Sequence, residues 1–218
     1  ATLSGNKISV NLVGAKANTA TAIANASNIA CIEDSAIALT GVLEVNARGN
    51  TWALATVDQG ANAGVATVGL IVVYAEVGGE CKAYIDASDS KSIAAGSIAV
   101  DVNHIAKVEA ATTRAAGGVQ VSVVSGDNNM ATAKTTDRTT AAIIGSGAVQ
   151  ATGALNVRAI GTGIALAEVQ SPAGSVGGVS IATNVVIATL NTIQNAYISC
   201  GGISAGTVKV LSKYNDGA

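Results

Sequence analysis

The chain has 218 residues, of which 49% are hydrophobic but only 2% aromatic and 12% charged, and its formal net charge is −2. Ala, Val and Ile supply most of the apolar content, so the interior is expected to be narrow and filled by small side chains. This composition excludes a disordered chain, which would be polar and highly charged. The 12 Lys and Arg residues are scattered, which argues against a nucleic-acid binder with its basic stripe.

Export and membrane signals are not visible in the sequence. The most apolar run, residues 64–77, is followed by Gly-Gly-Glu-Cys-Lys and is shorter than the roughly 20 residues of a membrane-spanning helix. The N-terminus has no basic region followed by an apolar segment, as a signal peptide would have. Either a signal peptide has been removed or the chain is an excised fragment. Because neither terminus shows a capping helix, we expect residues 1–218 to be one segment cut from a longer filament.

Short stretches of alternating apolar and polar residues recur along the chain, and this period of two predicts strands. Each stretch follows a glycine, in chain order Gly5, Gly41, Gly64, Gly96, Gly118, Gly153, Gly178 and Gly206. Long and short spacings between these glycines mostly alternate and range from 22 to 36 residues. The members of one set, Gly41, Gly96, Gly153 and Gly206, are 55, 57 and 53 residues apart.

Apolar triplets repeat with the same spacing. Ala-x-Ile stands at residues 30–32, 83–85 and 196–198, and Ala142-Ile143-Ile144 takes this place in the third unit. Tyr84 and Tyr197 fill the middle position, which predicts an outward row.

A repeat of this length predicts a solenoid, because short strands bury their apolar faces only when successive turns stack. We expect a right-handed parallel β-helix of about eight turns, with two turns in each unit of roughly 55 residues. At about 4.8 Å per turn this gives a rod of about 38 Å. The competing fold is an antiparallel sandwich, which would need more hairpin turns of the Asn-Gly type than the sequence has.

The alternation also predicts which side chains point inward. Ile98, Val100 and Val102 are expected inside and Asp101 outside; Val119, Val121 and Val123 are expected inside in the same way. The polar stretches at residues 18–28, 125–140 and 187–195 are expected to be surface loops, which often form the functional face of a solenoid.

Catalytic and metal-binding signatures are weak. His104 is the one histidine, and we interpret it as a turn residue, because a Ser-His-Asp triad is defined by a geometry that the sequence does not give. The acidic candidates are Glu33 with Asp34, Asp86 with Asp89, and Asp127, but they lack the EF-hand spacing. Threonines in residues 131–140 do not recur in one phase, so an ice-binding row is a minor alternative.

We therefore predict no enzyme, no cofactor and no metal site. The cysteines Cys31, Cys81 and Cys200 have no Cys-x-x-Cys spacing, so we expect three free thiols.

The repeated units resemble those of very large bacterial surface exoproteins, the leukotoxin-type and filamentous-haemagglutinin-like adhesins. The resemblance is carried by "KAYIDAS…IAAGSIAVDV", "GALNVRAIGTGIALAEV" and "NAYIS…ISAGTVKVLS", and it covers about residues 5–212. It implies a right-handed parallel β-helix, secretion or display at the cell surface, and a role as a structural and adhesive rod.

Several functions remain open from the sequence. The rod would bind a glycan or protein ligand of a host or neighbouring cell through its loops. It would alternatively be a polysaccharide-acting or phage-fibre β-helix, or a purely self-assembling fibre component with end-to-end association. Nucleic acid and membrane insertion are not expected.

Overall fold

The structure is a computed structural model, and it describes residues 2–3, 9–59, 62–88, 91–114, 120–170, 175–176 and 178–215. These residues form strands joined by short turns, without a helix. No helix with the length and apolarity of a membrane span therefore occurs in this part of the chain. Gly5, Asp89, Gly118, Val119 and Pro172 lie outside the described residues.

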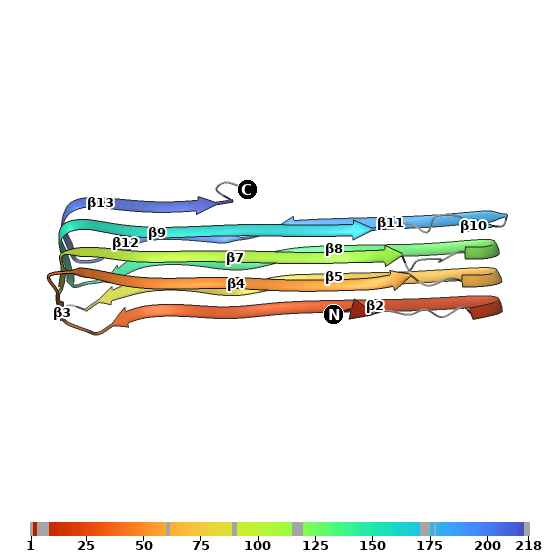
Figure 1. Cartoon of the computed structure of the whole chain (residues 1–218), viewed down its shortest axis with the longest axis horizontal. Coiled ribbons are helices and arrows are strands. Elements are labelled where there is room, and N and C mark those ends of the chain that lie inside the picture. The colour runs from red at the N-terminus through yellow and green to blue at the C-terminus, as the bar shows by residue number, and fades with distance from the viewer. Residues whose placement is uncertain are drawn as a thin grey trace.

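Two parallel sheets make up the fold (Figure 1). The first sheet contains β2 (Ser9–Glu33), β5 (Asn62–Ala87), β8 (Gln120–Gly145), β10 (Ser175–Val176), β11 (Val179–Leu190) and β12 (Ile193–Ser199). The second sheet contains β1 (Thr2–Leu3), β3 (Ile37–Ala38), β4 (Val42–Gln59), β6 (Ile93–Ala95), β7 (Ser97–Arg114), β9 (Ala148–Val169) and β13 (Gly202–Tyr214).

The chain runs along a strand of the first sheet, turns, and returns along a strand of the second sheet (Figure 1). Strands of successive units then lie side by side, so that the N-terminal strands are at one end of the stack and the C-terminal strands at the other. The prediction of an all-β fold with parallel strands is confirmed, and the antiparallel alternative is wrong for the described strands.

The pairing register corrects the predicted turn length. Asn62 of β5 pairs with Gln120 of β8, and Val42 of β4 pairs with Ser97 of β7. In both pairs the partners are separated by one whole repeat unit of the sequence. The unit is therefore a single step of the stack, and the prediction of two turns in each unit is wrong.

The two halves of each unit do not pair with each other, because they belong to different sheets. Each half is one long strand of 18 to 26 residues in the first three rows, not a turn of three short strands. Apart from the two-residue β1, which pairs with β4, the described strands stack four rows deep, which at about 4.8 Å per step is about 14 Å. The predicted eight turns and the predicted length of the rod are therefore wrong. The strands are much longer than the stack is deep, because β5 alone spans about 85 Å at about 3.3 Å per residue.

Identical or similar apolar side chains stack in columns between the sheets. One column is Ile32, Ile85, Ile143 and Ile198, and the column beside it is Ala30, Ala83, Ala141 and Ala196. In the third unit the triplet is thus Ala141-Ala142-Ile143, one residue earlier than predicted. The inner members Ile85 and Ile143 are fully buried, so adjacent rows cover each other's apolar faces. Small stacked side chains of this kind leave no room for rings, which explains the composition.

The predicted inward positions are confirmed in β7 but wrong in β8. Ile98, Val100 and Val102 are buried in the core, and Asp101 points outward to Arg158. In β8, however, Val123 is 57% exposed while Ser122 is buried. A strand's side chains change face with a shift of one residue, and the pairing partner sets this register.

Residues 18–28 and 125–140, predicted to be loops, lie inside β2 and β8, and residues 187–195 extend from β11 into β12. Their backbone groups pair with neighbouring strands, which satisfies them without a loop even though the side chains are polar.

One predicted glycine set forms a corner of the stack. The Gly96 amide donates to the carbonyl of Gly41 at 2.8 Å, and the Gly153 amide donates to the carbonyl of Gly96 at 2.7 Å. A Cβ added to Gly96 would overlap the carbonyl oxygen of Thr40. The backbone of successive rows therefore approaches so closely that glycine is required in the middle of this column.

Candidate functional site

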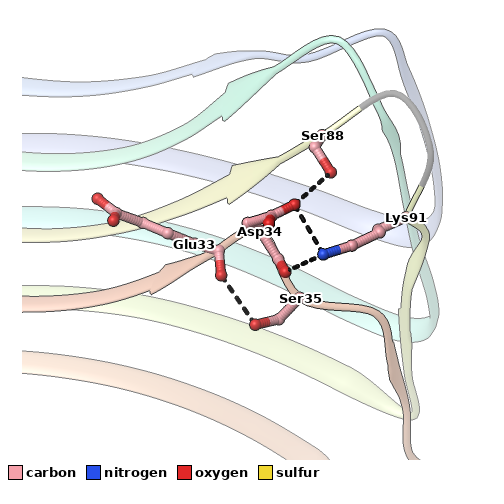
Figure 2. A network of polar contacts seen from close by, with 5 residues as sticks. All are labelled: Glu33, Asp34, Ser35, Ser88 and Lys91. Atoms are coloured by element: carbon pink, nitrogen blue, oxygen red, sulfur yellow. Dashed lines mark hydrogen bonds and ion pairs between the residues drawn. The ribbon is translucent and has the colours of Figure 1, made fainter.

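The acidic pair Glu33 and Asp34 lies at the turn that follows β2 (Figure 2). Lys91 Nζ lies 2.8 Å from Asp34 Oδ1 and donates to the Asp34 carbonyl at 2.5 Å. Ser88 Oγ donates to Asp34 Oδ1 at 3.4 Å. Because Ser88 and Lys91 belong to the next row, these contacts join two successive turns.

Asp34 is held in this network by its charge and by its backbone. The hydrogen bond and charge of Lys91 lower the pKa of the Asp34 carboxyl from its ordinary value. Asp34 has a φ of 46°, a left-handed conformation that Asp tolerates better than most residues. The turn at Asp34 therefore holds the first row against the second row through its contacts with Ser88 and Lys91.

Among the described residues, the remaining acidic candidates form no group that is placed to hold a metal ion. Glu33 directs its carboxylate away from Lys91 (Figure 2) and accepts a hydrogen bond from the hydroxyl of Tyr84, which raises the pKa of that phenol. Asp86 pairs in register beside Glu33 in the next strand, Asp127 lies in β8, and Asp89 is outside the described residues. Within the described ranges no group of three His, Cys, Asp or Glu side chains is placed to hold a metal ion.

His104 lies inside the molecule, so its prediction as a turn residue is wrong. It belongs to β7 and is 2% exposed. Its Nδ1 lies 3.1 Å from Oδ2 of Asp137, and its Nε2 lies 3.3 Å from Oγ1 of Thr51. Asp137 is on β8, so this carboxylate–imidazole contact links the two facing sheets.

A carboxylate, an imidazole and a hydroxyl in this order have the connectivity of a catalytic triad. The hydroxyl belongs to a threonine, however, and Thr51, His104 and Asp137 are all 5% exposed or less. The hydroxyl is therefore not presented to solvent, and the arrangement acts as a polar clamp between the sheets. The sequence gives no signal for Asp137 or Thr51, since the three residues are far apart along the chain.

The clamp is the centre of a polar layer that separates two apolar clusters of the core. Thr135 Oγ1, Asp137 Oδ1 and Thr139 Oγ1 are buried there and have no hydrogen-bond partner among the described residues. Gly49 and Gly161 flank His104 in the register of the second sheet. A Cβ at Gly49 would lie 2.7 Å from His104 Cδ2, so Gly49 makes room for the imidazole, whereas a Cβ at Gly161 would meet the side chain of Gln194.

The cysteines occupy three different environments, and all are free thiols as predicted. Cys81 is fully buried, and burial raises the pKa of its thiol to about 11. Cys31 is exposed and Cys200 is partly buried. Cys31 shares its register position with Tyr84 and Tyr197, which confirms the predicted row.

A shallow groove crosses the outer face of the second sheet. It is lined by Asp101, Asn156, Arg158, Lys209 and Leu211, and by Ala99, which pairs in register with Asn156. Arg158 Nε donates to Oδ1 of Asp101 at 3.0 Å. The groove therefore presents hydrogen-bonding groups and two cationic side chains on strands rather than on loops.

Comparisons with family models, with curated proteins and with solved structures gave no match. The function proposed for the chain therefore depends on its own residues and geometry.

Proposed function

We propose that the chain is a segment of a right-handed parallel β-helix that serves as a structural and adhesive rod in a secreted or surface-exposed bacterial exoprotein. The observation that supports this most is the register. The long strands of successive units pair in parallel at steps of one repeat unit, as Ser9 with Asn62 and Asn62 with Gln120 illustrate. A chain built in this way is a scaffold whose length grows by adding equivalent rows.

The adhesive part of the proposal places ligand contact on the strand faces. The stretches predicted to be binding loops are strands, so the polar groove on the outer face of the second sheet is the better candidate. Its Arg158 and Lys209 side chains suit a ligand with carboxylate or hydroxyl groups, such as an acidic glycan or an acidic protein segment, because charged donors form the stronger hydrogen bonds.

A glycan and protein array with the isolated chain tests this proposal. We expect ligands that bind the wild type and bind Arg158→Ala more weakly. The matched control is Lys134→Ala, which removes a cation from the outer face of the first sheet, where Lys134 lies 3.6 Å from Glu76. Equal loss in both variants, or no ligand on the array, would contradict ligand contact through the groove.

A further inference from the structure

The outer face of the first sheet is apolar over one part of its length, toward the end where β10 and β11 lie (Figure 1). Ile71, Val73 and Ala131 are buried between the sheets, so the residues that alternate with them on these strands face outward. We call the outward residues of four ranges, equivalent in the register, the apolar face. The ranges are 13–21, 66–74, 124–132 and 179–187.

Large aliphatic side chains of the apolar face are in contact with solvent in successive rows. Val68 is 57% exposed, Val124 50% and Ile181 66%. None of the outward residues in the four ranges is charged, because Lys16 and Asp127 alternate to the inner side. A contiguous apolar area without charges is uncommon on the free surface of a monomer and marks an interaction site.

The apolar face does not depend on the two ends of the stack. Val68, Leu70 and Val124 belong to β5 and β8, and both of these strands have a neighbouring strand on each side. Rows added beyond either end would lie beside these strands in the same sheet. They would therefore enlarge the apolar face and would not cover it.

We propose that the apolar face of one copy of this chain packs on the apolar face of a second copy, with the two sheets about 10 Å apart. A two-fold axis brings the same patch of both copies together. Because the patch has no charges, it meets itself without electrostatic repulsion. The pairing does not depend on the ligand proposed above.

The area of the apolar face is sufficient for a stable pair. Outward residues follow each other at about 6.6 Å along a strand, and rows lie about 4.8 Å apart. Five outward residues in each of four rows therefore cover about 33 Å by about 19 Å, or about 630 Å². Two copies would bury about 1,250 Å² in total, which is within the range of specific interfaces.

The relief of the apolar face also suits packing against another sheet. Gly126 lies between Val68 and Ile181 in the register. A Cβ added to Gly126 would meet no atom within 4 Å, so the surface is hollow there, while the two neighbouring side chains project from it. Side chains of two packed sheets interdigitate, and a projecting side chain of the second copy fits this hollow.

The border of the apolar face favours a second copy over a lipid surface. Surfaces that bind membranes combine apolar residues with Lys and Arg on the polar side. Along β5 and β8 the face is followed by Glu76 and Lys134, whose charged atoms lie 3.6 Å apart. Tyr74 at the same border donates its hydroxyl to Glu76. This border therefore offers lipid headgroups no unpaired cation.

Pairing through the first sheet leaves the second sheet free. The groove with Asp101 and Arg158 is on the outer face of the second sheet, so a pair of copies presents two grooves on opposite sides. On the proposed function, two such grooves on one particle increase the apparent affinity for a surface with repeated ligands.

Sedimentation velocity of the chain over a concentration series tests the pairing, with circular dichroism to verify that each variant keeps its β-structure. The wild type is expected to dimerise, and high salt should not weaken the dimer, because the contact contains no charges. Leu70→Lys, near the middle of the apolar face, should weaken dimerisation about tenfold or more, because it buries an unpaired charge. Val68→Thr keeps a β-branched side chain and should weaken it less.

Ile164→Lys is the matched control for Leu70→Lys. Both side chains are 45% exposed, but Ile164 belongs to β9 and faces outward from the second sheet. Dimerisation of Ile164→Lys should therefore equal that of the wild type. The wild type should also not cosediment with neutral phosphatidylcholine vesicles.

Four results would overturn the proposal. The first is a wild type that stays monomeric at every concentration, and the second is a monomer that binds the vesicles, which would assign the apolar face to lipid. The third is equal weakening by Leu70→Lys and Ile164→Lys. The fourth is a dimer that dissociates at high salt. None of these measurements uses a ligand, so the adhesive function can fail while the pairing holds.

Discussion

The Nδ1 atom of His104 lies 3.1 Å from Oδ2 of Asp137, and both side chains are almost completely buried although they come from different sheets. This contact joins β7 and β8, which follow each other along the chain but belong to different sheets. Removing either side chain should leave the other without its polar partner in the interior, and a buried polar group without a partner costs free energy.

Asp137→Ala and His104→Ala should each lower the free energy of unfolding by about 2 to 5 kcal/mol. The double variant should lose less than the sum, because each single change already breaks the pair. Denaturant unfolding of the four proteins gives the coupling energy. A coupling near zero would contradict a clamp between the sheets.

Thr51→Val should lower the free energy of unfolding less than these two substitutions do. It keeps the shape of the side chain but removes the hydroxyl 3.3 Å from Nε2 of His104. We expect a loss of about 1 kcal/mol in the same unfolding measurement, the ordinary value of one hydrogen bond.

Val100 and Asp101 are neighbours in β7 that face opposite sides of the sheet. Val100→Ala should cost about 2 kcal/mol, and Val100→Asp should prevent folding, because it buries an unpaired charge. Asp101→Asn removes only a partly exposed ion pair with Arg158 and should cost less than about 1 kcal/mol. Thermal melts followed by circular dichroism compare them, and equal effects would contradict the register.

Gly96 and Gly41 offer a second matched pair, because they occupy the same repeat position in successive rows. Gly96→Ala would push its Cβ against the carbonyl oxygen of Thr40, whereas an alanine Cβ at Gly41 meets nothing within 4 Å. We expect Gly96→Ala to be clearly destabilising, by about 2 kcal/mol or more, and Gly41→Ala to be neutral within about 0.5 kcal/mol. Urea unfolding measures both, and a tolerated Gly96→Ala would contradict the close approach of the rows.

The three cysteines should react with a thiol reagent at different rates under native conditions. Cys31 is exposed, Cys200 is partly buried and Cys81 is buried, so labelling should occur in that order. Because burial raises the pKa of Cys81 to about 11, its reactive thiolate is also scarce at pH 8. Mass spectrometry of the labelled protein identifies the sites. Early labelling of Cys81 would mean that β5 is not covered on both sides.

The raised pKa of Cys81 also predicts that the folded protein loses stability at alkaline pH. The folded protein keeps the proton of Cys81 up to a pKa of about 11, whereas the unfolded chain releases it near 9. The folded state thus binds more protons between these values, so the free energy of unfolding should fall as pH rises from 9 to 11, by about 2 to 3 kcal/mol at most. Cys81→Ala should fall less steeply over this range. An equal slope in both proteins would show that Cys81 is not the cause.

The sequence alone determined the local features of this protein. The alternation of Ile98, Val100 and Val102 requires a strand with one buried face, and the spacing of Gly41, Gly96, Gly153 and Gly206 marks the length of the repeat unit. The row of Cys31, Tyr84 and Tyr197 also follows from that spacing. These features are readable because alternation and repetition are properties of adjacent or equivalent residues.

Only the tertiary structure decided which strands pair and how long they are. It showed that the unit is one step of the stack, that residues 125–140 belong to a strand, and that His104 meets Asp137 between the sheets. A polar residue such as Asp137 gives no local sign of facing inward, because its direction depends on the register with β5 and on the side chain opposite. The pairing partner of a parallel strand lies a whole repeat unit away along the chain, so the pattern within a strand cannot select it.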